Sequence, residues 1–305
     1  MIFKQKSSLI LCQIILRMGF NFTEVERVES ISAKDFQKYY VKPQKPVVVE
    51  RITEDWPAYE KWNFEYIKQV AGDKVVPLYN NDPVDYTKKV NEPVARMKMS
   101  EYVDLLQEKP TDLRIFLYNL MSQVPQLQKD YRMPDLGLNL FKSMPMLFFG
   151  GAGSNVFMHY DIDLANILHF HFAGEKKCII VPPQDSKYMY KIPYSVICRE
   201  DIDFDNPDFD KWPALRHINP MVADLKHGEM LYMPEGWWHY MKYITPGFSM
   251  SLRSLAHKPK NFSEAVYNIF VMRNIDNVMR KMKGQKWIDE KNERAIRNTN
   301  KLITK

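Results

Sequence analysis

The fold is decided by a series of short β-rich runs: MLFFG at 146–150, VFMHYD at 156–161, ILHFHF at 167–172, KKCIIVP at 176–182, EMLYMP at 229–234, HYMKYI at 239–244 and FSMSLRSL at 248–255. Glycine and proline turns separate these runs, and a helical period is almost absent from them. Many short strands joined by such turns are typical of a β-sandwich or barrel. The sequence therefore predicts a mainly β core at about 140–256.

The segments before and within this core have a different character. Residues 21–150 have the pattern of a mixed α/β region, with a buried strand expected at 46–49 and helices at 64–70 and 100–107. The stretch 185–220 is polar, aromatic and proline-containing. We expect it to form a long insertion over one rim of the core, where it could provide a peptide-binding groove.

A helical period returns after residue 260. An apolar stripe follows this period, Gly284 is a good helix end, and a second, more charged helix is expected at about 287–302. Such a stripe either packs on the β core or pairs with its copy in a homodimer. The stripe consists of Phe262, Val266, Ile269, Ile275, Val278, Met279 and Met282.

Composition limits the function classes. The 305 residues include 45% hydrophobic and 26% charged residues, which is ordinary for a globular protein. The three cysteines form no CxxC, which argues against a disulfide framework or a structural zinc site and favours a reducing, cytoplasmic setting. With 11 glycines against 19 prolines, a glycine-rich phosphate-binding loop is not expected.

Both ends of the chain raise alternatives. Residues 1–20 are apolar but are interrupted by Gln13 and Arg17 and are too short to span a bilayer, so Met18 is an alternative translation start. From Lys258 onward, twelve Lys/Arg residues face five Asp/Glu residues. This basic tail could contact nucleic acid, anionic lipid or an acidic partner, but a solvated helical face is the favoured interpretation, and nucleic-acid binding is not expected.

Three side chains form a candidate metal site. His159 and Asp161 are two residues apart, so in a strand they project from the same face, and His239 follows at the end of a later β run. Two histidines and one carboxylate leave three positions of an octahedral metal open, as non-haem Fe(II) oxygenases require. A histidine and an aspartate at this spacing are common by chance, so the surrounding sequence has to support this interpretation.

That surrounding sequence resembles a known family. KPVVVERITEDWPAYEKW, MKMSEYVDLL, HYDIDLANILHFHFAGEKKCIIVPP, GEMLYMPEGWWHYM and GFSMSLRSL are similar, in order and spacing, to the JmjC/cupin-8 oxygenases, especially the branch of the asparaginyl hydroxylase that inhibits hypoxia-inducible factor. The resemblance covers residues 44–255. It implies a double-stranded β-helix (jelly-roll) core with an N-terminal α/β extension and C-terminal helices that form a homodimer.

The resemblance also implies roles for individual residues. His159, Asp161 and His239 match the iron ligands, and Lys176 matches the lysine that binds the far carboxylate of 2-oxoglutarate. Phe116 stands where the related hydroxylase has a tyrosine beside 2-oxoglutarate, so Tyr118 could supply the hydroxyl instead. Where that hydroxylase has an asparagine, this chain has Arg253, which would add a second cation near the co-substrate if it pointed inward.

The implied function is an Fe(II)- and 2-oxoglutarate-dependent dioxygenase that uses O₂ to hydroxylate a protein or peptide side chain, giving succinate and CO₂. A small-molecule oxygenase and a non-catalytic metal-binding cupin acting as an interaction module are the alternatives. The expected division is an N-terminal segment at 1–20, an oxygenase domain at 21–256 and a basic helical dimerisation segment at 257–305.

Overall fold

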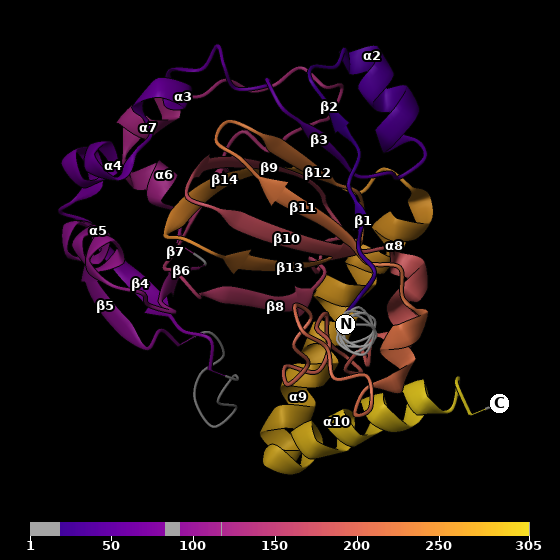
Figure 1. Ribbon diagram of the computed structural model, residues 1–305. Coiled ribbons are helices and arrows are strands. Elements are labelled where there is room, and N and C mark those ends of the chain that lie inside the picture. The colour runs from indigo at the N-terminus through magenta and orange to yellow at the C-terminus, as the bar shows by residue number, and fades with distance from the viewer. Residues whose placement is uncertain (1–18, 83–91, 117, 305) are drawn as a thin grey trace, which may run out of the picture.

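The computed structural model describes residues 19–82, 92–116 and 118–304 (Figure 1). Of the N-terminal segment expected at 1–20, only the last two residues therefore fall within the described part. Within the described ranges, no helix is long and apolar enough to cross a membrane.

Two facing sheets form the core. The first has five strands in the order β1 (Thr23–Glu24), β11 (Met221–Leu225), β10 (Lys176–Val181), β13 (Trp238–Tyr243) and β8 (Asn155–His159). The second has nine strands in the order β2 (Arg27–Val28), β3 (Val47–Val49), β12 (Met230–Met233), β9 (Asn166–Ala173), β14 (Gly247–Ser254), β7 (Met146–Gly150), β6 (Arg114–Ile115), β4 (Val75–Tyr79) and β5 (Ala95–Lys98).

This arrangement confirms the predicted jelly-roll. Its eight core strands, β7 to β14, fall between residues 146 and 254 and divide equally between the two sheets. The interior is lined from both sides, since Ile180 and Met241 of the first sheet cluster with Ile167 and Leu231 of the second. β2 to β6 come from the N-terminal part of the chain and extend the second sheet, which agrees with the predicted α/β extension.

Helices cover the outer face of the nine-stranded sheet. Aromatic side chains make this contact: Trp56 packs on Phe170 and Trp62 on Phe172, with ring centroids 4.9 Å and 4.7 Å apart. The N-terminal helices surround the top and left of the molecule in Figure 1. They are α2 (Ala33–Phe36), η1 (Gln37–Val41), α3 (Pro57–Lys61), α4 (Phe64–Ala71), α5 (Met99–Glu108), α6 (Leu120–Gln123) and α7 (Pro125–Lys129).

The insertion and the C-terminal helices cover the other sheet. A second apolar cluster joins Ile179 and Trp238 of the five-stranded sheet to Trp212 of the insertion and Ala265 of the first C-terminal helix. The insertion contains η2 (Pro183–Tyr188) and η3 (Pro213–His217). The C-terminal part contains α8 (Pro259–Tyr267), η4 (Asn268–Met272), α9 (Arg273–Lys283) and α10 (Gln285–Asn300). In Figure 1, α8 lies beside the sheets, and α9 and α10 lie below them.

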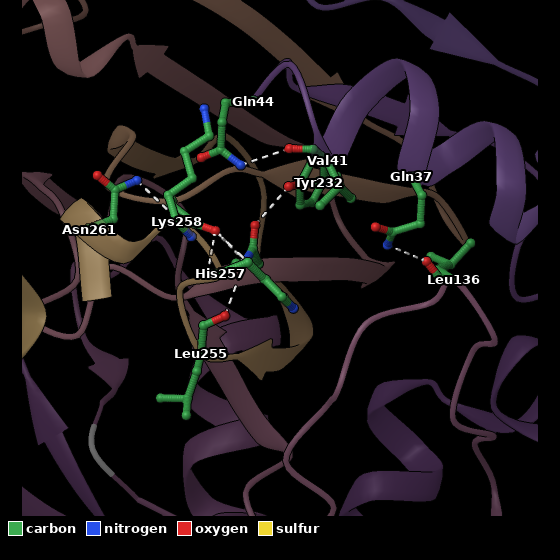
Figure 2. A network of polar contacts seen from close by, with 11 residues as sticks. Gln37, Val41, Gln44, Leu136, Tyr232, Leu255, His257, Lys258 and Asn261 are labelled. Atoms are coloured by element: carbon green, nitrogen blue, oxygen red, sulfur yellow. Dashed lines mark hydrogen bonds and ion pairs between the residues drawn. The ribbon is translucent and has the colours of Figure 1, made fainter. Parts of the chain in front are cut away.

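A buried carboxylate ties the C-terminal helices to the core. Glu235, in the turn before His239, accepts hydrogen bonds from the backbone N–H of His257 at 2.6 Å and from Asn261 Nδ2 at 2.8 Å. Asn166 of β9 donates to the same carboxylate and accepts from the Tyr232 hydroxyl at 2.7 Å. Figure 2 shows Tyr232, His257 and Asn261 converging from these separate elements. The network fixes where α8 begins relative to the strand that carries His239.

Candidate metal centre and active-site cavity

His159, Asp161 and His239 meet at one point. β8 pairs with β13 so that His159 lies opposite His239, and the two imidazole centroids are 4.1 Å apart. Asp161 lies two residues after the end of β8, and its Oδ1 lies 3.9 Å from His159 Nε2. One donor atom from each residue lies within 4.8 Å of the others. This spacing is suitable for one metal ion with ligands near 2 Å.

The hydrogen bonds of both histidines leave a ligand atom free. Nδ1 of His159 lies 2.9 Å from the Phe157 carbonyl, and Nδ1 of His239 lies 3.1 Å from the Trp237 carbonyl. Because a carbonyl only accepts, each Nδ1 carries the proton and each Nε2 keeps its lone pair. Burial lowers the pKa of His159 and lowers the pKa of His239 to about 3, so both rings are neutral at pH 7.

Arg253 holds the carboxylate of the group. Its Nη2 donates to Asp161 Oδ2 and, at 3.0 Å, to Asp163 Oδ1. Burial would raise the pKa of Asp161, but Arg253 and the two imidazoles outweigh burial and lower it. Asp161 is therefore ionised, with Oδ2 engaged and Oδ1 on the side of the histidines. The donor set and protonation states fit a divalent cation.

A cavity of about 570 Å³ opens from this group. Its volume is within the range of ligand-binding sites. Strands of both sheets line it, the insertion contributes Ile192 and Tyr194, and the C-terminal helices contribute Arg273 and Asn277. The insertion therefore borders the cavity, as expected from its place in the sequence, and the C-terminal helices form a further wall.

Lys176 lies in the same cavity and is almost completely buried. Its Nζ lies 3.0 Å from His169 Nε2 and 3.3 Å from both the Tyr243 hydroxyl and Ser249 Oγ. Burial lowers the pKa of Lys176 to about 8. Among the residues that the structure describes, no carboxylate forms an ion pair with this ammonium. The cavity therefore contains a cation that an anionic ligand could neutralise.

The strand register separates Lys176 from the metal centre. On β13, His239 pairs with Ile180 and Tyr243 pairs with Lys176. Four strand residues correspond to about 13 Å at about 3.3 Å per residue. The same register applies on β14, where Ser249 contacts Lys176 and Arg253 contacts Asp161. The cavity therefore has a metal-ligand end and a lysine end.

The sequence-based expectations for three other residues have different outcomes. Arg253 points inward, but it contacts Asp161 at the metal-ligand end rather than sharing the lysine end. Phe116 lines the cavity, with its ring edge-on to Tyr79. The expectation for Tyr118 was wrong, because its hydroxyl donates to Gln123 at 3.0 Å and it does not line this cavity. β6 ends at Ile115, so alternation along a strand does not apply to Tyr118.

Two residues at the lysine end were not found from the sequence. Tyr243 lies in the apolar run HYMKYI, and nothing in that run distinguishes it from a residue that packs in the core. Arg114 lines the cavity from β6, a strand of only two residues with no readable pattern.

The comparisons with known proteins agree with the fold. A family profile described as a cupin-like domain matches residues 33–273. The chain belongs to the cupin-like domain family. This match confirms the JmjC/cupin-8 resemblance at the level of the family.

Several curated proteins are similar to this cupin-like chain. Lysine-specific demethylase 8 of Xenopus tropicalis is 26% identical over 75% of this chain and 52% of its own length. Lysine-specific demethylase JMJ30 of Arabidopsis thaliana is 29% identical over 80% of this chain and 57% of its own length. The tRNA wybutosine-synthesizing protein 5 of Homo sapiens is 25% identical over 70% of this chain and 72% of its own length. The chain thus spans a little over half the length of the two demethylases.

Proposed function

We propose that this chain is an Fe(II)- and 2-oxoglutarate-dependent dioxygenase that hydroxylates a side chain of a protein or peptide. The reaction would consume the substrate C–H, 2-oxoglutarate and O₂, and would give the C–OH product, succinate and CO₂. One observation carries the proposal: a cavity that has three metal-ligand side chains at one end and a buried lysine at the other.

Different residues of the cavity would bind the metal and the co-substrate. His159, Asp161 and His239 would hold Fe(II), which when bound supplies the O₂-activating chemistry. Arg253 keeps Oδ2 of Asp161 occupied, which would leave Oδ1 to bind the metal. Lys176 would neutralise the far carboxylate of 2-oxoglutarate through a charge-assisted hydrogen bond. Apolar side chains of the cavity wall, among them Phe148, Ile167 and Met241, would limit the access of water to the site of oxidation.

An anaerobic spectrum tests the metal and co-substrate together. Fe(II) and then 2-oxoglutarate are added to the purified protein, and the visible spectrum is recorded. We expect a weak metal-to-ligand charge-transfer band that is absent in His159→Ala. A folded protein that contains iron but gives no band would contradict the oxygenase proposal and would favour the non-catalytic metal-binding cupin.

The choice of a macromolecular substrate rests on the cavity walls. Residues of the insertion and of α9 line the cavity from separate parts of the chain, which suits a substrate that contacts both segments. Succinate release, measured with and without candidate peptides, would identify a coupled substrate. A small molecule that couples as well as any peptide would favour the alternative of a small-molecule oxygenase.

Lysine demethylation is the second candidate, because two of the similar proteins are named lysine-specific demethylases. Hydroxylation of an N-methyl group gives a hemiaminal that releases formaldehyde, so the same site could perform it. Formaldehyde release from a methyl-lysine peptide would support demethylation. A mass increase of one oxygen on an unmethylated peptide would support hydroxylation.

We also propose a homodimer through the C-terminal helices. Eight apolar side chains of α8, η4 and α9 are between 37% and 74% exposed in the single chain. A surface of this kind is uncommon on a monomer and typical of an interface. The eight are Phe262, Val266, Tyr267, Phe270, Val271, Ile275, Val278 and Met282.

A further inference from the structure

Arg114 is a buried guanidinium with an unused donor. The residue is only 9% exposed, and its Nη1 donates to the Asn80 carbonyl and, at 3.1 Å, to Asn81 Oδ1. Its Nε is buried and has no hydrogen-bond partner. The Asp112 carboxylate interacts electrostatically with Arg114 but makes no ion pair with it. Among the described residues, no other carboxylate forms an ion pair with Arg114 either. An unpaired buried donor on a charged group costs stability, so its presence needs a reason.

Arg114 and Lys176 are connected through Tyr243. Arg114 pairs across β6 and β7 with Gly150. A Cβ on Gly150 would lie 2.3 Å from the Tyr243 ring, so the ring lies directly against this glycine. The centroid of the same Tyr243 ring lies 4.5 Å from Lys176 Nζ. All three side chains line the cavity of the metal-ligand group.

Both cations belong to the end of the cavity remote from the metal ligands. Tyr243, which contacts Lys176 and packs on Gly150, is four residues from His239 on β13. A ligand bound through one end at His159, Asp161 and His239 would therefore extend its other end toward Lys176 and Arg114. Two buried cations at the same end favour a ligand with a carboxylate there.

We propose that Arg114 is a second cationic contact, beside Lys176, for the far carboxylate of a 2-oxo dicarboxylic acid. This inference rests on the proposed function and adds a residue that determines co-substrate selectivity. A planar guanidinium can donate to a carboxylate oxygen while Lys176 donates to the other oxygen. The ligand would also satisfy the unused Nε–H of Arg114 and reduce the repulsion between the two cations.

The test compares two 2-oxo acids that differ only at the far end. 2-Oxovalerate has the five carbons of 2-oxoglutarate but lacks the far carboxylate. Both are titrated by calorimetry into the full chain loaded with Mn(II), so no turnover is required. The measured quantity is the dissociation constant of 2-oxovalerate divided by that of 2-oxoglutarate. In Arg114→Met we expect this ratio to fall about ten- to a hundredfold, the worth of a hydrogen bond to a charged group, with 2-oxovalerate affinity unchanged.

Three further variants make the result decisive. Lys176→Met should lower the same ratio, and Arg132→Met, an exposed arginine paired with Asp55, should leave it unchanged. Arg114→Gln keeps an amide donor for the Asn80 carbonyl, so it provides the test if Arg114→Met does not fold, and its ratio should fall as well. A wild-type ratio in a folded Arg114→Met or Arg114→Gln would overturn the inference. If the wild-type protein binds neither acid, the proposed function fails and the inference fails with it.

Discussion

Lys176 Nζ lies 3.0 Å from His169 Nε2, and both groups are buried. The ammonium donates to the imidazole, so His169 carries its proton on Nδ1, which lies 2.8 Å from Ser251 Oγ. Burial, and then the charge of Lys176, lower the pKa of His169 well below its usual value, which keeps the ring neutral. The neutral His169 thus orients the lysine without neutralising it, and the charge remains available to a ligand.

The affinity for 2-oxoglutarate should fall as the pH rises above about 8. Burial lowers the pKa of Lys176 to about 8, so below this pH the amine is charged and above it the amine is neutral. A neutral amine gives up the charge-assisted bond, and the affinity should approach a tenfold loss per pH unit. Calorimetry of the Mn(II)-loaded protein between pH 7 and 9.5 measures this dependence.

Two controls isolate Lys176 in that experiment. 2-Oxovalerate lacks the far carboxylate, so its affinity should follow the metal centre alone and lack the additional slope. Lys176→Arg, whose guanidinium stays protonated, should bind 2-oxoglutarate with the shallower dependence of 2-oxovalerate. A parallel loss of affinity for both acids in the wild-type protein would refute the assignment to Lys176.

The same pKa shift affects stability in the absence of ligand. The folded value of about 8 is lower than the usual 10.5, so the unfolded chain binds more protons between these pH values. The free energy of unfolding contributed by Lys176 should therefore rise with pH through this window. Denaturant unfolding of the wild-type protein and of Lys176→Met measures it, and the rise should be smaller in the variant.

Arg253→Met should weaken metal binding without removing a ligand. Arg253 holds Oδ2 of Asp161, and partners of this kind typically change metal affinity about ten- to a hundredfold. Mn(II) titration followed by electron paramagnetic resonance gives the dissociation constant. Asp161→Ala should cause a larger loss and Arg132→Met none. Wild-type Mn(II) affinity in a folded Arg253→Met would show that Asp161 needs no such support.

Local periodicity explains which features the sequence could predict. Strand alternation predicted that His159 and Asp161 project together, and their ligand atoms lie within 4.8 Å of each other although β8 ends at His159. The same reasoning failed for Tyr118, since β6 ends at Ile115. The partner of Arg253 also had no local signal, because Asp161 is 92 residues away in the sequence.

Gly150→Ala should disturb the lysine end of the cavity. An added Cβ would lie 2.3 Å from the Tyr243 ring and 2.5 Å from Ser154 Oγ, so the ring must move from its place beside Lys176. Overpacking of this kind costs about 1–3 kcal/mol. We expect a lower free energy of unfolding and weaker 2-oxoglutarate binding. Gly19→Ala, which meets nothing within 4 Å, is the matched control. Equal stability of both variants would mean that the ring has room to move.

The exposed apolar face of the C-terminal helices should hold two copies together. Val278 is 53% exposed and Met282 is 74% exposed, and they lie one helical turn apart on α9. In Val278→Glu/Met282→Glu two carboxylates would be buried without partners at the interface, so the mass measured by light scattering should fall from that of a dimer to that of a monomer. Lys286→Glu, an exposed charge reversal on α10, should leave the dimer intact. A wild-type protein that is monomeric at micromolar concentration would instead show that this face does not bind a second copy.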